Sequence, residues 1–110
     1  MAHSLNKGKT FEREIAKKLQ ELGFKDARST AQWSGKVSAD VDGLDGFHIE
    51  CKRRRFTSPF LRDTWKQIDN DRNEKSGILF WRADRGEIHV DLRLSDLKQL
   101  VDLFANLPKE

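Results

Sequence analysis

Four carboxylates and a lysine are concentrated in one short segment of the sequence. The acids are Asp40, Asp42, Asp45 and Glu50, and Lys52 follows them. Acids placed in a packed interior need a cation or a hydrogen-bonding partner, since an isolated buried charge is costly. Carboxylate oxygens are the ligands that Mg²⁺ prefers, usually one or two per ion with water and substrate phosphate. The segment is therefore a candidate metal site, in which Lys52 would orient or help to deprotonate an attacking water.

The residues around Glu50 alternate between apolar and ionisable side chains. The apolar set is Phe47, Ile49 and Cys51, and the ionisable set is His48, Glu50 and Lys52. Such alternation predicts a β-strand in which Glu50 and Lys52 share a face about 6–7 Å apart. Asp40 lies upstream, across a glycine-containing turn that can fold back beside them. We interpret His48 as a hydrogen-bonding neighbour or a DNA contact rather than as a metal ligand, because Mg²⁺ prefers oxygen ligands.

Asp42 and Asp45 are each followed by a glycine. Asp-Gly is first of all a turn signal, so we interpret both acids as turn residues. The alternative is that they are additional metal ligands.

The first expected element is an amphipathic helix from Thr10 to Leu22 that ends at Gly23. Its apolar residues have helical spacing and are Phe11, Ile15, Ala16, Leu19 and Leu22. At about 100° per residue, Glu12 falls on the apolar side of this helix, whereas Arg13 points away. Glu12 is therefore either an edge residue that reaches solvent or an arginine such as Arg28, or a member of the candidate site.

The rest of the chain predicts a small mixed β-sheet flanked by helices, which is an α/β fold. The expected elements are a short strand at 27–31, a loop at 32–36, a helix from Ser58 and Pro59 towards Lys75, a hairpin of 78–81 with 88–92, and a last helix capped by Ser95. That last helix carries one apolar stripe made of Leu97, Leu100, Val101 and Phe104. Trp65 and Trp81 are expected in the core.

Length and composition limit the possible classes of protein. The chain has 110 residues, which suffices for one domain, 1–110, with one core. It is 36% hydrophobic and 35% charged, so it should fold with a highly charged surface. A single cysteine, Cys51, excludes an intramolecular disulfide and a Cys-rich zinc site and suits a reducing compartment. No apolar run is long enough to cross a bilayer and no signal peptide is apparent, so we expect a cytoplasmic protein.

A basic run directly follows the candidate strand. Arg53, Arg54 and Arg55 come after Lys52, and the net charge of the chain is +3. A run of this kind is usually a solvated face, but next to a phosphoryl-transfer site we prefer a phosphate clamp. In the loop before Asp40, Ser34 and Lys36 are expected to contact the DNA backbone, and Trp33 to stack on a base or lie in a dimer interface.

Asp40, followed ten residues later by Glu50-Cys51-Lys52, resembles the Asp, Glu-x-Lys signature of the PD-(D/E)XK nuclease superfamily. Ala39 stands where that signature has proline. The segment 7–14 (KGKTFERE), with Gly23-Phe24 and Arg28-Ser29, resembles the opening of archaeal-type Holliday junction resolvases. The resemblance extends motif by motif over residues 7–92.

The resemblance implies a restriction-endonuclease-like core and a Mg²⁺ cofactor for which Mn²⁺ can substitute. It implies metal binding by Asp40 and Glu50, a supporting functional glutamate at Glu12, and completion of the metal sphere by the backbone carbonyl of Cys51. It also implies DNA contacts by Arg13 and Arg28, although an exposed salt-bridging Arg13 is an equal alternative. Resolvases of this kind are homodimers that make paired nicks in four-way DNA junctions.

The functional expectation is thus a Mg²⁺-dependent, structure-specific DNA endonuclease, with a junction resolvase as the first choice. A nicking, restriction or repair endonuclease acting on duplex DNA would share the same motif. A DNA-binding module without catalysis is a different class, and a ribonuclease or a small structural protein stays open as well. Metal dependence and a comparison of junction with duplex substrates discriminate among these.

Overall fold

The computed structural model describes residues 2–30, 39–54 and 60–108. Its elements, in order, are α1 (Ala2–Glu21), β1 (Arg28–Ser29), β2 (Val41–Asp42), β3 (Phe47–Arg54), α2 (Phe60–Asp71), β4 (Ser76–Ala83), β5 (His89–Asp91), the 3₁₀ helix η2 (Leu94–Asp96) and α3 (Leu97–Ala105). The described residues confirm the predicted α/β class, with a mixed five-stranded sheet and flanking helices.

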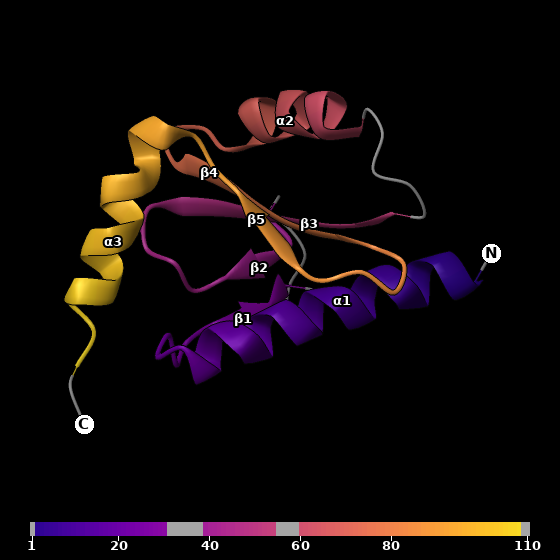
Figure 1. The fold of residues 1–110 in the computed structure, drawn as a ribbon, viewed down its shortest axis with the longest axis horizontal. Coiled ribbons are helices and arrows are strands. Elements are labelled where there is room, and N and C mark those ends of the chain that lie inside the picture. The colour runs from indigo at the N-terminus through magenta and orange to yellow at the C-terminus, as the bar shows by residue number, and fades with distance from the viewer. Residues whose placement is uncertain (1, 31–38, 55–59, 109–110) are drawn as a thin grey trace.

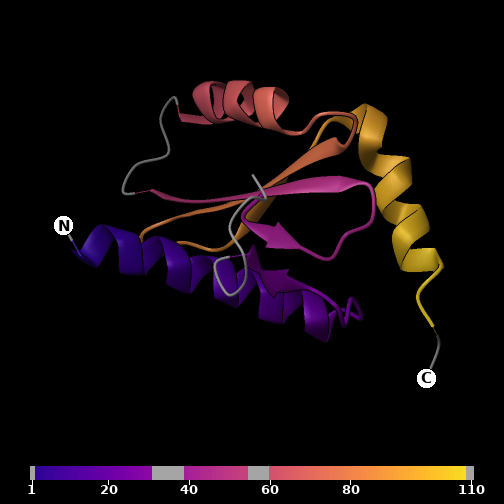
Figure 2. The ribbon, with the colours of Figure 1, turned by 180° about the vertical axis from the view of Figure 1, so that it is seen from behind.

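The sheet has the strand order β1-β2-β3-β4-β5. β3 and β4 are parallel and pair from Phe47 with Ser76 to Arg54 with Ala83, whereas the other neighbouring strands are antiparallel. A parallel pair needs a crossover connection, and α2 lies within the connection from β3 to β4. Figures 1 and 2 show α1 along one side of the sheet, α2 along the other, and α3 at one end. The central strand β3 therefore has a helix on each of its faces.

The main core lies between α1 and the sheet. Phe11, Ile15 and Leu19 of α1 are buried against a cluster that includes Ile49 of β3 and Ile78 of β4. The predicted apolar face of β3 is confirmed, because all three of its residues belong to this cluster. Burial of these side chains removes apolar surface from water, which is the main stabilising contribution of the fold.

The second layer forms where α2 covers the opposite face of β3 and β4. Ile68 and Thr64 of α2 are buried there, and Gly77 of β4 lies directly beneath the helix. A Cβ atom at Gly77 would lie 2.6 Å from Cγ2 of Ile68 and 2.9 Å from Cζ3 of Trp65. The absence of a side chain at Gly77 thus allows α2 to approach the sheet closely.

Two predictions about the first half of the chain need correction. α1 begins at Ala2 rather than Thr10, because Gly8 within a helix costs only about 1 kcal/mol relative to alanine and does not end it. The strand predicted at 27–31 is the two-residue β1, and it pairs with β2, which the sequence pattern did not reveal. Two-residue strands are too short to display an alternating pattern.

The predicted start of the last helix is also wrong, and its apolar stripe is covered only in part. Ser95 does not cap α3: it lies in η2, whose turn is closed by a hydrogen bond from the Leu97 N–H to the Leu94 carbonyl, and the N-cap residue is Asp96. Of the predicted stripe, Leu100 packs against the core, but Leu97, Val101 and Phe104 are exposed. α3 therefore packs on the core through Leu100 and Leu103, with Leu107 just after the helix, and the Phe104 ring meets Phe24 edge-on with 5.0 Å between ring centroids.

Trp65 and Trp81 are only partly buried, so the prediction that they are core residues is wrong. The polar end of the Trp65 indole explains its position, because its Nε1 donates a hydrogen bond to Asp91 at 2.6 Å. Trp81 stacks on the ring of His89 with 4.6 Å between ring centroids. Among the described helices, none combines the length and apolar character needed to cross a membrane.

Candidate active site

Asp40 is held in place by the strands on both sides of it. Its backbone carbonyl accepts hydrogen bonds from the N–H and hydroxyl of Thr30, each at 3.1 Å, and its N–H donates to the carbonyl of Ile49 at 3.0 Å. Its side chain accepts a further bond from the backbone N–H of Cys51, at 2.9 Å from Oδ2. These bonds bring Asp40 beside β3, as the folded-back turn of the sequence prediction requires.

Glu50 is buried on the face of β3 that α2 covers, with 2% of the residue exposed. His48 Nε2 lies 3.2 Å from Glu50 Oε1, and Nε2 of Gln67 on α2 donates to Glu50 Oε2 at 3.4 Å. The Lys52 ammonium lies 3.7 Å from the same Oε2 atom. Glu50 and Lys52 therefore share one strand face as predicted, and the Lys52 side chain remains 25% exposed. The Lys52 side chain is thus accessible from solvent.

Glu12 also belongs to this group of charges. It is partly buried on α1, and Oγ of Ser29 donates a hydrogen bond to its Oε1 at 3.4 Å. Burial raises the pKa of Glu12, the hydroxyl of Ser29 opposes the rise, and the negative charge of Glu50 adds to it. Of the two interpretations of Glu12, the structure thus supports a place beside the other carboxylates. Ser29 was noted in the sequence only as part of the Arg28-Ser29 motif and of a predicted strand, and neither indicated its contact with Glu12.

The pKa of Asp40 is raised from its ordinary value of 3.8 to about 8. Burial is the largest cause, and the charge of Glu50 is the next, while the hydrogen bond from the Cys51 N–H opposes them. The charge of Glu12 raises the pKa further. Glu50 and Glu12 are thus close enough to Asp40 to disfavour its ionisation, and a proton or a cation on Asp40 would relieve this repulsion.

Cys51 faces the core with its side chain and the candidate site with its backbone. Cys51 is 8% exposed as a residue, and burial raises the pKa of the thiol well above the ordinary value of 9.0. A buried thiol of this kind is unreactive, because the thiolate is the nucleophilic form. The contribution of Cys51 that the structure describes is the backbone N–H donated to Asp40.

The donor set fits a hard divalent cation. Within the described residues, no group of three or more His, Cys, Asp and Glu side chains is arranged to hold a metal ion. Mg²⁺ does not need such a group, because it is usually held by one or two carboxylates with water and phosphate in the remaining positions. Asp40 and Glu50 are carboxylates of this kind, and the raised pKa of Asp40 indicates an excess of negative charge where they meet.

Asp42 is the last residue of β2, Asp45 lies in the turn between β2 and β3, and both are exposed. Oδ1 of Asp42 accepts a hydrogen bond from the N–H of Gly43 at 3.0 Å, and Gly43 and Gly46 both have positive φ. The prediction of a turn residue therefore holds for Asp45, whereas Asp42 ends a strand and accepts the hydrogen bond at the start of the turn.

The predicted DNA contacts are distributed over several surfaces. Arg13 and Arg28 have exposed side chains, on α1 and β1 respectively. Arg53 shares the strand face of Cys51 rather than that of Lys52, and its Nε lies 3.5 Å from Oδ1 of Asp84. Ser34, Lys36 and Arg55 lie outside the described residues, as do Trp33 and the side chain of Arg54.

Sequence reasoning identified Arg13 as a candidate DNA contact but overlooked the row of basic residues on α1 to which it belongs. Lys9, Arg13 and Lys17 are spaced four residues apart and are exposed. Residues at this spacing lie on one face of a helix. Lys9 and Arg13 both act on Glu12, because their positive charges oppose the rise in its pKa. The row therefore runs beside the candidate site.

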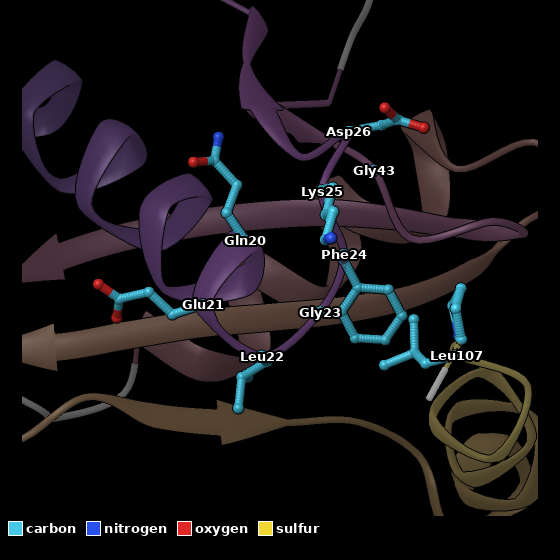
Figure 3. A pocket seen from close by; sticks show the side chains of 10 residues that line it. Gln20, Glu21, Leu22, Gly23, Phe24, Lys25, Asp26, Gly43 and Leu107 are labelled. Atoms are coloured by element: carbon cyan, nitrogen blue, oxygen red, sulfur yellow. The ribbon is translucent and has the colours of Figure 1, made fainter. Parts of the chain in front are cut away.

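A surface cavity of about 660 Å³ lies elsewhere, at the C-terminal end of α1. Figure 3 shows the Phe24 and Leu107 side chains close together there. Its lining residues are Gln20, Glu21, Leu22, Gly23, Phe24, Lys25, Asp26, Gly43, Leu107 and Pro108, and none of them belongs to the candidate site.

No protein-family model, no curated protein and no solved structure matches this chain. A functional assignment therefore depends on the chemistry and geometry of the residues around Asp40 and Glu50.

Proposed function

We propose that the chain is a Mg²⁺-dependent DNA endonuclease with a restriction-endonuclease-like core, in which Asp40 and Glu50 bind the cation and Glu12 supports them. Lys52 acts on the attacking water and on the phosphate. The preferred substrate is a four-way DNA junction, on the resemblance of residues 7–92 to archaeal-type Holliday junction resolvases. Mn²⁺ is expected to substitute for Mg²⁺.

The observation that carries this proposal is that two carboxylates from other elements, Glu50 and Glu12, lie near enough to the buried Asp40 to raise its pKa. Glu12 comes from α1, Asp40 precedes β2, and Glu50 lies on β3. Burial and the charges of Glu50 and Glu12 raise the pKa of Asp40 to about 8, so ionisation of this carboxyl is costly unless a cation offsets the charge. Strongly shifted pKa values of this kind concentrate at functional sites.

The residues of the chain have distinct roles in this chemistry. When bound, Mg²⁺ supplies Lewis-acid stabilisation of the charge that develops on the phosphate. Asp40 and Glu50 contribute carboxylate oxygens, which a divalent cation prefers. The ammonium of Lys52, 3.7 Å from Glu50 Oε2 and partly exposed, is placed to orient a water molecule and to offset negative charge on the phosphate.

DNA binding is expected along the basic row of Lys9, Arg13 and Lys17 on α1. Contacts to phosphate are independent of sequence and weaken strongly with salt. The row lies next to Glu12, so a DNA backbone bound along it would approach the candidate site. Arg28 on β1 is a further proposed phosphate contact, whereas Arg53 would first have to leave Asp84.

We also propose that the active form is a homodimer. α3 exposes an apolar surface, and its large members are Leu97, Val101 and Phe104 with Leu94 of η2 before them. Contiguous exposed apolar side chains are typical of surfaces that bind another protein.

Cleavage of a labelled four-way junction, beside the matching linear duplex, tests the proposed activity. Each substrate is incubated with Mg²⁺ or with EDTA, using the native chain, Glu50→Gln and Glu12→Gln. Glu14→Gln is the matched control, because Glu14 is also on α1 but is ion-paired with Arg82 at 2.7 Å. We expect paired nicks in the junction with Mg²⁺, their loss with EDTA and in Glu50→Gln, a strong reduction in Glu12→Gln, and no loss in Glu14→Gln.

The other outcomes of this assay discriminate among the alternatives. Cutting of both substrates would retain a nuclease and exclude junction specificity. Binding of DNA without cutting in Mg²⁺ or Mn²⁺ would contradict the catalytic proposal and favour a DNA-binding module.

A further inference from the structure

The carboxylate of Glu50 is held from two sides by residues outside the Asp, Glu-x-Lys signature. His48 Nε2 lies 3.2 Å from Oε1, and Gln67 Nε2 donates to Oε2 at 3.4 Å. An anion that is 2% exposed would be strongly destabilising without such partners. Each oxygen of Glu50 therefore has a side-chain partner that fixes its direction.

The fold determines the position of both partners. His48 lies two residues before Glu50 on β3, so the two side chains share a strand face, and His48 is itself only 3% exposed. Gln67 comes from α2. This helix lies close to the sheet because Gly77, which pairs with His48 on the neighbouring strand β4, has no side chain. Gln67 is exposed, so it reaches Glu50 from the rim of the site.

A metal-binding carboxylate depends on such outer contacts. An ionised carboxylate only accepts hydrogen bonds, and fixing one lone pair on each oxygen limits the directions in which the others can bind a cation. Loss of an outer partner of a metal ligand typically weakens metal affinity or activity by about 10- to 100-fold.

We propose that His48 and Gln67 are positioning residues that orient the Glu50 carboxylate for a divalent cation. This inference rests on the proposed metal site. Neither residue is assigned a contact with the reacting atoms, because both act through Glu50.

Direct titration with Mn²⁺, followed by electron paramagnetic resonance, tests the positioning role without relying on cleavage. The variants are His48→Leu, which removes the ring nitrogens, His48→Gln, which retains an N–H donor, and Gln67→Met, which removes the amide. Gln99→Met is the matched control, because Gln99 makes its hydrogen bonds to Ser76 and Gly46, which are not part of the site. Glu50→Gln identifies the signal that belongs to the site.

We expect His48→Leu and Gln67→Met each to raise the Kd for Mn²⁺ by about tenfold or more. His48→Gln should restore affinity close to that of the native chain, and Gln99→Met should leave it unchanged. At saturating metal, His48→Leu should lower kcat for cleavage and leave KM for DNA unchanged, since His48 is buried. Circular dichroism verifies folding. If His48→Leu does not fold, the exposed position of Gln67 makes Gln67→Met the deciding variant.

The results separate the positioning role from the metal site itself. Native Mn²⁺ affinity in Gln67→Met and in His48→Leu, with loss of binding in Glu50→Gln, would overturn the positioning role and leave the metal site standing. Absence of Mn²⁺ binding by the native chain, or equal binding by Glu50→Gln, would overturn the metal site and the positioning role together.

Nitrogen NMR of the imidazole gives a second readout in the metal-free protein. The contact of His48 with an accepting carboxylate requires a proton on Nε2. We expect an Nε2–H signal for His48 that shifts in Glu50→Gln. A neutral ring with its proton on Nδ1 alone would overturn the proposed hydrogen bond.

Discussion

Oδ2 of Asp40 accepts a hydrogen bond from the backbone N–H of Cys51 at a distance of 2.9 Å. This contact fixes the first acid of the Asp, Glu-x-Lys segment to the strand that carries the other two groups. It also leaves Asp40 beside Glu50. After burial, the negative charge of Glu50 is the largest cause of the raised Asp40 pKa. The donor is a backbone group, so the identity of the side chain at position 51 is not needed for the bond.

Asp40→Asn should change how the stability of the metal-free protein depends on pH. Asp40 ionises near 3.8 when unfolded and near 8 when folded. Between these values the folded chain binds more protons than the unfolded chain, so native stability falls as the pH rises from about 4 to about 8. Asparagine retains an acceptor for the Cys51 N–H and carries no charge. We expect it to stabilise the fold at pH 8 by at least about 1 kcal/mol, and by less at pH 5.

Thermal unfolding of both chains in EDTA, recorded from pH 5 to pH 9, checks this prediction. The Tm of the native chain should decrease with rising pH more steeply than that of the variant. Parallel profiles would show that Asp40 does not have a raised pKa in the folded chain. Mg²⁺ should stabilise the native chain and not Asp40→Asn, since binding to the native state raises stability.

Gly77→Ala should destabilise the fold by moving α2 away from β4. The new Cβ would lie 2.6 Å from Cγ2 of Ile68, which is completely buried. Overpacking of this kind costs about 1–3 kcal/mol. Urea unfolding followed by circular dichroism measures the loss. Gly86→Ala is the control, because its Cβ would meet no atom closer than 3.2 Å. Equal losses in the two variants would contradict this account of Gly77.

Trp65→Phe should weaken the connection between α2 and β5. The indole Nε1 donates to Oδ2 of Asp91 at 2.6 Å, and phenylalanine keeps an aromatic ring beneath Arg93 but removes the donor. We expect a loss of about 1 kcal/mol in the free energy of unfolding, which is typical of one hydrogen bond. A double-mutant cycle with Asp91→Ala isolates the interaction. An unchanged cost of Trp65→Phe in the Asp91→Ala background would exclude the hydrogen bond as its cause.

Val101→Glu should reduce self-association without unfolding the monomer. Val101 is 54% exposed, and surface substitutions usually change stability by no more than about 0.5 kcal/mol. A charge in an apolar interface opposes association, so sedimentation velocity should show a dimer for the native chain and more monomer for the variant. Lys98→Glu, at an 85% exposed side chain of the same helix, is the control. A monomeric native chain at all concentrations would exclude the proposed dimer.

The strand that carries Glu50 and Lys52 was predictable because its pattern is local. Alternation over Phe47 to Lys52 places successive side chains on opposite faces, whatever the strand pairs with. The inward direction of Glu12 was predictable for a similar reason, since helical periodicity alone determines which face of α1 it occupies. The α/β fold class was predictable from the order of the helices and strands along the chain.

Other parts of the site had no local pattern. β2 comprises only Val41 and Asp42, and it exists because β1 and β3 supply partners on its two edges. The contact of Gln67 with Glu50 joins residues 17 positions apart, and it depends on how closely α2 approaches Gly77. The covered residues of α3 could not be predicted either, because its apolar residues are too numerous for one stripe and only contact with the core selects which of them are covered.

The linear chain thus specified the identity of the charged groups and the faces of the elements that carry them, since side-chain direction within a helix or strand is set by backbone geometry. Three-dimensional packing specified their distances and their ionisation. The raised pKa of Asp40 comes from burial and from Glu50 and Glu12, which are neighbours in space rather than along the chain. Such long-range effects depend on distance and desolvation, and neither quantity exists before the chain has folded.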